Sequence, residues 1–371
     1  MFLCFALIVS MPSVFGAASL ALDEGAVHVF AGTGRHGADS TESVVEFNLP
    51  GGIAGLPGGY LLVADTFNNI VRSLTDEGLD GGFFGTVEIA ARDSFPMGFY
   101  RDGEGAYAGF RRPMDVAVRE DGYVFVADSL NHSIRVGVEG RFYTFVGGRG
   151  SGHADGAAHV ARFNSPSAIA ICPRGNIYVA DTLNHVVRRI DANGNTTTVA
   201  GRPGSHGYSG GRGTAVRFDS PMGIAVAEDG RIFVADTGNN VIRVIQNGLV
   251  STFAGTMSRV GVRERDGHAD GWGLNAVGGF RDGRGAEARF SAPVGLAMWN
   301  GNIIVADSGN HSIRMVDGNG VVTTLGGNGY PGIYEDGAAL FHLPRGVYVR
   351  GDYLYIADTG NNMIRRMPLS Q

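Results

Sequence analysis

Residues 61–72 read Leu61-Leu62-Val63-Ala64-Asp65-Thr66-Phe67-Asn68-Asn69-Ile70-Val71-Arg72, and the chain repeats this pattern five more times. Each copy begins with an apolar run that ends in Ala-Asp. The next four positions are Thr or Ser, a free residue, Asn, and then either Asn or His. An arginine follows seven positions after the aspartate. The aspartates are Asp65, Asp128, Asp181, Asp236, Asp307 and Asp358; the arginines are Arg72, Arg135, Arg188, Arg243, Arg314 and Arg365. Six copies at this spacing indicate a repeat architecture, because one such unit cannot bury its own faces.

The motif predicts a β-hairpin. Four apolar or small residues in a row, as in Ile232-Phe233-Val234-Ala235, indicate a strand buried on both faces. The Asp and Asn residues that follow favour a tight turn, since they bond nearby backbone N–H groups and tolerate left-handed conformations. We interpret the aspartates and arginines as structural residues, because chemistry seldom needs six copies of one group. Each pair is expected to form a partly solvated ion pair near the end of its sheet.

Each hairpin is preceded by a Phe-x-x-Pro sequence and a short apolar strand, and it is usually followed by one more strand. Proline suits the first position of a strand because it has no N–H to donate. We therefore predict four-stranded antiparallel units, without helices, near residues 50–91, 110–148, 163–201, 218–255, 290–327 and 341–367.

Six such units predict an all-β fold, a six-bladed β-propeller of four-stranded antiparallel blades over residues 26–367. The last unit lacks a fourth strand, whereas Val27-His28-Val29-Phe30-Ala31-Gly32 is a spare strand before the first unit. We expect this N-terminal strand to complete the last blade and close the ring. Deleting residues 26–32 should then destabilise the whole domain.

Composition narrows the chemistry. The chain has 371 residues, 44% of them apolar, and 60 glycines, which fits many short strands and turns around a sizeable core. All 30 basic residues are arginine, so Schiff-base and lysine-nucleophile chemistry are excluded. The net charge of −6 argues against nucleic-acid binding through a basic face.

The N-terminus has the pattern of a signal peptide over residues 1–19, with a short apolar run followed by Gly16-Ala17-Ala18-Ser19. The run is too short for a comfortable membrane span. We expect a secreted or extracellular-facing protein; targeting to an organelle, or membrane anchoring by the same segment, is the alternative. Removal of Cys4 would leave Cys172 as the one cysteine, with no intrachain disulfide.

The repeated hairpin and its upstream Pro-x-Gly-Ile-Ala strand resemble the NHL repeat family of six-bladed propellers. The resemblance covers residues 26–367 and implies the fold, but this family includes protein-binding and RNA-binding modules, extracellular domains and a lyase. Function must therefore be sought where the repeats differ. The connections 91–109 and 256–289 are long, and both are expected on the rim that carries the hairpin turns.

Candidate ligand-binding residues follow from these differences: Asp115, Arg345, Arg263, Arg265, Trp272 and Arg281. Asp115 is the carboxylate at a channel position where the other repeats have Gly or Ala. Arg345 precedes the corresponding glycine of the last repeat, and the other four lie in or beside the 256–289 connection. The repeated Asp-Gly pairs, such as Asp155-Gly156, are interpreted as turns.

The sequence favours a non-enzymatic binding or scaffold propeller that recognises a protein, peptide or glycan through this rim. We predict a monomer, no cofactor, no catalytic residue, no nucleic-acid partner and no membrane span beyond the N-terminal segment. One alternative is a calcium-dependent hydrolase or lactonase, although Asp115 is a single carboxylate among small residues. A zinc lyase is another, but the position after each first-strand proline is never histidine. An RNA-binding module is the third.

Overall fold

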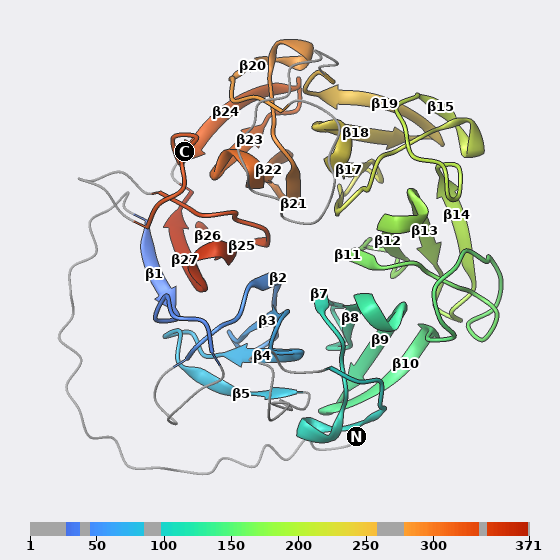
Figure 1. Cartoon of the computed structure of the whole chain (residues 1–371), viewed down its shortest axis with the longest axis vertical. Helices are drawn as coiled ribbons and strands as arrows, with labels where there is room; N and C mark the ends of the chain where they lie inside the picture. Colours follow the sequence, from blue (N-terminus) through green and yellow to red (C-terminus); the bar gives the residue numbers. More distant parts are fainter. Residues whose placement is uncertain (1–26, 38–44, 85–97, 258–277, 334–339, 370–371) are drawn as a thin grey trace, which may run out of the picture.

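A computed structural model describes residues 27–37, 45–84, 98–257, 278–333 and 340–369. They form six antiparallel sheets arranged radially around one central channel (Figure 1). We call the strands of each blade a to d, from the channel outwards. Each apolar run forms strand b, and the Ile-Arg or Val-Arg pair after the turn falls in strand c, as the hairpin motif predicted.

Each blade contains four strands, a to d, which are consecutive in the chain except in blade six. Blade one contains β2 (Pro50–Gly55), β3 (Leu61–Asp65), β4 (Ile70–Leu74) and β5 (Asp80–Phe84); blade two contains β7 (Pro113–Val118), β8 (Val124–Asp128), β9 (Ser133–Val138) and β10 (Arg141–Gly147). Blade three contains β11 (Pro166–Ile171), β12 (Ile177–Asp181), β13 (Val186–Ile190) and β14 (Thr196–Ala200); blade four contains β16 (Gly223–Val226), β17 (Ile232–Asp236), β18 (Val241–Gln246) and β19 (Leu249–Ala254). Blade five contains β21 (Pro293–Trp299), β22 (Asn302–Asp307), β23 (Ser312–Val316) and β24 (Val321–Gly326); blade six contains β25 (Val347–Arg350), β26 (Tyr353–Asp358), β27 (Met363–Pro368) and β1 (His28–Ala31).

Closure of the ring by the N-terminal strand is confirmed. Strand β1 pairs antiparallel with β27, with Val29 opposite Arg365, in the sheet ordered β1-β27-β26-β25 (Figure 1). Phe30 packs edge-on against Tyr355, with ring centroids 5.0 Å apart. Because β1 supplies strand d of the last blade, blade six has four strands and β27 is paired on both sides.

Among the described residues, three blades have a fifth, two-residue strand that the sequence did not predict. The connection entering the blade first runs up its outer edge, pairs there with strand d, and then returns to start strand a. These strands are β6 (Gly103–Glu104), β15 (Gly211–Arg212) and β20 (Gly283–Arg284), followed by the 3₁₀ turns η1 (Gly105–Tyr107), η4 (Gly213–Ala215) and η6 (Gly285–Glu287).

The hydrophobic core lies between blades. One cluster joins Phe125 and Ala127 of blade two to Phe163, Ile169 and Val179 of blade three, and five similar clusters involve the other blades. The phenylalanine of each Phe-x-x-Pro sequence is at most 1% exposed. Blades of this kind depend on their neighbours, because each buries its faces against the next one.

The two faces of the ring carry different turns. Strands a and c run in the same direction, so the b-to-c turns and the d-to-a connections meet on one face, which we call the hairpin face. The a-to-b and c-to-d turns form the opposite face. Five of the b-to-c turns contain a 3₁₀ turn: η2 (Ser129–Asn131), η3 (Thr182–Asn184), η5 (Thr237–Asn239), η7 (Ser308–Asn310) and η8 (Thr359–Asn361).

Candidate functional site

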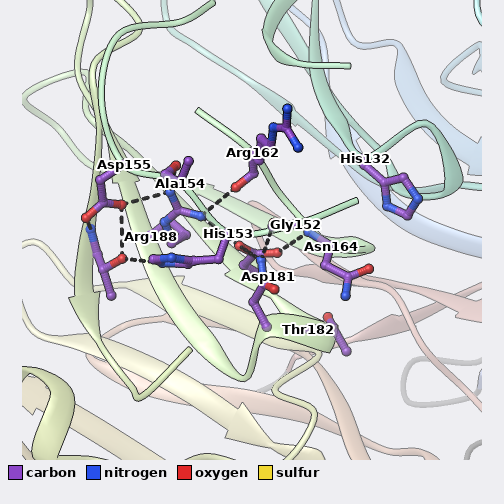
Figure 2. Close-up of polar contacts among 12 residues, drawn as sticks. His132, Gly152, His153, Ala154, Asp155, Arg162, Asn164, Asp181, Thr182 and Arg188 are labelled. Atoms are coloured by element: carbon purple, nitrogen blue, oxygen red, sulfur yellow. Dashed lines mark hydrogen bonds and ion pairs between the residues drawn. The ribbon is translucent and has the colours of Figure 1, made fainter. Parts of the chain in front are cut away.

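The repeated aspartate is a buried hub of hydrogen bonds. In blade three, Asp181 accepts the backbone N–H of Asn164 at 2.7 Å through Oδ1. Its Oδ2 accepts from Arg188 Nη1 at 2.8 Å (Figure 2). The same oxygen accepts from Asn184 Nδ2, also at 2.8 Å. One carboxylate thereby fixes the turn, strand c and the segment leading into strand a.

All six aspartate and arginine pairs form ion pairs, with N···O distances from 2.7 to 3.4 Å. The expectation that they would be partly solvated is wrong. The aspartate side chains are 0% exposed and the arginines at most 2%, because the Phe-x-x-Pro segment of the incoming connection covers the guanidinium. Burial raises the pKa of Asp181 to about 6, while Arg188 and the hydrogen-bond donors oppose this shift, so the carboxyl is mainly ionised at neutral pH.

In three blades the arginine binds a second carboxylate, supplied by the Asp-Gly pairs that the sequence suggested were turns. Arg188 Nη2 lies 2.8 Å from Asp155 Oδ1, and Arg135 and Arg314 contact Asp102 and Asp282 in the same way (Figure 2). Blade four has Gly210 at this position, and Arg243 keeps only the bond to the preceding carbonyl, that of Ser209, which the other three arginines also make to theirs. Asp336, the corresponding residue of blade six, lies outside the described residues.

The Asn-or-His position of the motif links each blade to the next. This residue has a left-handed backbone conformation. Its side chain accepts a hydrogen bond from the backbone N–H of the residue that directly precedes the Phe-x-x-Pro proline of the next blade. Asparagine Oδ1 accepts at 2.6 to 2.8 Å in three cases, and histidine Nδ1 at 3.0 to 3.1 Å in the other three. We call these bonds seam latches; they join Asn69 to Arg112, His132 to Ser165, His185 to Ser220, Asn240 to Ala292, His311 to Leu343, and Asn362 to Leu49.

The Thr-or-Ser position provides a second bond across the seams. Thr182, Thr237 and Thr359 donate their hydroxyls to the carbonyls of Pro221, Pro293 and Pro50, at 2.7 to 2.9 Å. The polar side chains of the motif therefore form hydrogen bonds within and between blades. The position after Thr or Ser carries no polar side chain in any of the six copies.

The central channel contains a cavity of about 350 Å³ lined by strand a of every blade. Asp115 and Arg345, both predicted from the sequence, line this cavity, together with Met114, Met222 and many small or aliphatic residues. Asp115 accepts the N–H groups of Val116 and Ile169, at 2.9 and 2.8 Å, and so connects blades two and three. Burial raises the pKa of Asp115 to about 7, although these two bonds counteract the shift.

The remaining predicted ligand residues do not converge on the channel. Arg281 is exposed on the outer part of blade five, where its carbonyl accepts from Arg314 at 2.9 Å. Arg263, Arg265 and Trp272 lie outside the described residues. Within the described ranges, no three His, Cys, Asp or Glu side chains are placed to share a metal ion. Those ranges also contain no helix long and apolar enough to cross a membrane.

Fold and repeat chemistry together define a six-bladed β-propeller in which a buried Asp-Asn-Arg network fixes each hairpin and the seam latches join the blades. The model of the NHL repeat matches residues 163–190, 218–245 and 290–314, and the model of the LVIVD repeat matches residues 344–364. The chain contains NHL repeats, matched over parts of blades three to five, and folds as a six-bladed propeller.

Named relatives are similar over part of their length. The chloroplastic protein SUPPRESSOR OF QUENCHING 1 of Arabidopsis thaliana is 32% identical over 46% of this chain and 17% of its own. NHL repeat-containing protein 2 of Bos taurus is 27% identical over 66% of this chain and 44% of its own. The chain thus spans less than half the length of these relatives.

Solved structures share the fold at low identity. An auxiliary nutrient binding protein from Bacteroides ovatus covers 93% of this chain, with 76% of its own length aligned, a TM-score of 0.59 and 16% identity. A gluconolactonase from Xanthomonas campestris covers 88%, with 87% of its own length aligned, a TM-score of 0.55 and 15% identity. Binding proteins and enzymes therefore both use this architecture, and the likeness shows the fold alone.

Proposed function

We propose that this propeller is a non-enzymatic recognition module that binds a protein or peptide on its hairpin face. The observation that carries the proposal is the free turn position of the motif. The motif's Asp, Asn and Arg residues are bonded inside the framework, whereas this turn position differs between blades, with Phe67, Leu130 and Leu183 in three of them and glycine in the rest. Leu183 is exposed, and Phe67 and Leu130 are half-buried. A repeat that varies at a turn position and keeps its internal ones is typical of a binding scaffold.

The channel favours recognition over hydrolysis. Both oxygens of Asp115 accept backbone N–H groups from two blades, so this carboxylate fastens the ring at its centre. A calcium-dependent hydrolase or lactonase needs several oxygen ligands that converge on one point. Secretion, predicted from residues 1–19, would present the hairpin face to extracellular partners.

Panning a phage library of short random peptides on the immobilised protein tests the proposal. We expect enriched peptides that slow hydrogen exchange in the b-to-c turns and leave the a-to-b turns unchanged. Lactone hydrolysis that appears when calcium is added, without any peptide enrichment, would instead favour the enzymatic alternative. Enriched peptides that protect only the opposite face would contradict the assignment of the binding surface.

A further inference from the structure

The free turn position divides the ring into two halves. Phe67, Leu130 and Leu183 occupy it in blades one to three, and glycine occupies it in blades four to six. The backbone is held alike in both halves. Leu130 N donates to Arg111 O at 3.0 Å, and Gly309 N donates to Ser291 O at 2.9 Å. The halves therefore differ in side chain and not in the path of the turn.

Neighbouring side chains occupy the space above each of the three glycines. A Cβ atom added to Gly238, Gly309 or Gly360 would lie 2.6 Å from a side-chain atom of Asp219, Ser291 or His342, respectively. In blades one to three the position carries a large apolar side chain, which is 39% exposed at Leu183 and half-buried at Phe67 and Leu130. One half of the hairpin face consequently presents an apolar ridge, and the other half does not.

Two arginines accompany the ridge. Arg111 and Arg112 are exposed at the entry to blade two, and no described carboxylate forms an ion pair with either one. The Arg112 guanidinium carbon lies 4.3 Å from the centre of the Phe67 ring, while the Arg111 carbonyl holds the turn at Leu130. Asp219 enters the same face at the next seam, after Leu183, and brings a negative charge at the end of the ridge.

We propose that Phe67, Leu130, Leu183, Arg111 and Arg112, which we call the apolar arc, bind a segment of a partner protein that presents apolar side chains beside carboxylates. The inference rests on the proposed function and names its partner class. Apolar side chains would cover the ridge, and carboxylates would pair with guanidiniums that can bind them through two parallel hydrogen bonds. Phenylalanine and arginine, which stack here as Phe67 and Arg112, are both enriched at the core of protein interfaces.

The repeat itself supplies a variant that should fold. In the triple variant Phe67→Gly, Leu130→Gly and Leu183→Gly, every free position becomes the glycine that three blades already carry. The probes are three synthetic peptides: one alternating leucine and glutamate, one with lysine replacing glutamate, and one with serine replacing leucine. Leu79→Gly is the matched control, because Leu79 is 55% exposed on the opposite face.

We expect the leucine-glutamate peptide to bind the wild type best, and the triple variant to bind it at least about tenfold more weakly. Arg111→Ser with Arg112→Ser should weaken binding and reduce its salt dependence. Leu79→Gly should bind like the wild type.

Equal affinity of the triple variant and the wild type would overturn the apolar arc, while recognition elsewhere on the hairpin face would stand. Equal binding of the lysine peptide would overturn the acidic character of the partner. A dimer of the wild type that dissociates in the triple variant would show a second copy of the chain as the occupant, against this proposal. Failure of every peptide, including the random library, would sink the recognition function itself.

Discussion

Replacing His132, His185 and His311 by asparagine should make the propeller less sensitive to acid. Each histidine accepts a backbone N–H through Nδ1, at 3.0 to 3.1 Å, so it can form its seam latch only while that nitrogen carries no proton. Protonation places an N–H opposite another N–H. Asparagine fills the same role at the other three seams and does not titrate in this range.

The direction of the effect follows from the surroundings of the histidines. Burial, followed by the nearby Arg111 charge, lowers the pKa of His132. Burial also lowers the pKa of His185, against the attraction of Asp219, whose carboxylate is 3.9 Å from Nδ1, and with a smaller contribution from His206. A folded-state pKa below that of the unfolded chain means that the unfolded state binds more protons, so stability falls as the pH drops through about 6.5.

The magnitude can be estimated from the latches. A hydrogen bond of this kind contributes about 1 kcal/mol net, so three latches correspond to about 3 kcal/mol. With an unfolding entropy of roughly 2.1 cal/mol/K per residue, this lowers Tm by about 4 °C in a chain of this length. The motif carboxyls also titrate in this range, since burial raises the pKa of Asp181 and its counterparts to about 6, but they are the same in both proteins.

The assay compares Tm near pH 7.5 and near pH 5 for the wild type and the triple asparagine variant. The wild type should lose about 4 °C more than the variant, and Asn240→His should increase the loss. Hydrogen exchange provides an internal control: at acid pH the N–H groups of Ser165 and Ser220 should lose protection relative to those of Arg112 and Ala292. An identical acid response of the two proteins would refute the latch mechanism.

Three further predictions concern the framework. Asp236→Asn should lower the free energy of unfolding by about 3 kcal/mol or more. Asp181→Asn should lower it by less, because Arg188 of blade three still pairs with Asp155. Chemical denaturation measures both losses, and equal losses would contradict the role of the second carboxylate. Asp115→Asn should gain stability relative to the wild type as the pH rises from about 4 to about 7, because burial raises the pKa of the Asp115 carboxyl from 3.8 to about 7 and over that range the folded state holds a proton that the unfolded state has lost; a constant difference in free energy of unfolding would exclude this titration. Deleting residues 26–32 should lower the free energy of unfolding by about 3 kcal/mol or more, since Val27 and Ala31 are buried. An unchanged Tm would contradict the role of β1 in closing the ring.

The hairpin, the blade count and the ring closure were predictable because they depend on local patterns. Strand b is a short apolar run, and the Asp-to-Asn turn follows at a fixed distance. The spare strand at residues 27–32 fits the missing one in the last blade. The solvation of the ion pairs was mispredicted, because the covering phenylalanine, such as Phe163 over Arg188, comes from another part of the chain.

Contacts between blades were beyond sequence reasoning. The choice between asparagine and histidine at the last turn position was visible in the sequence. Their hydrogen-bond partners were not, since Asn362 accepts the N–H of Leu49, 313 positions away. Asp115 was found because it is the one carboxylate at its repeat position, yet the N–H groups it binds were unforeseen. The two-residue strands such as Gly103–Glu104 are too short to leave a periodic signal.

The register at the closing seam determines how the molecule responds to a mechanical load. His28, near the start of β1, lies opposite Arg366, near the end of β27, so the two strands of this seam continue towards the chain termini from the same end of the pair (Figure 1). Force applied to both termini would load the hydrogen bonds one after another, like a zipper, rather than all together. Stretching should therefore open the ring into a linear array of blades at low force before any single blade unravels.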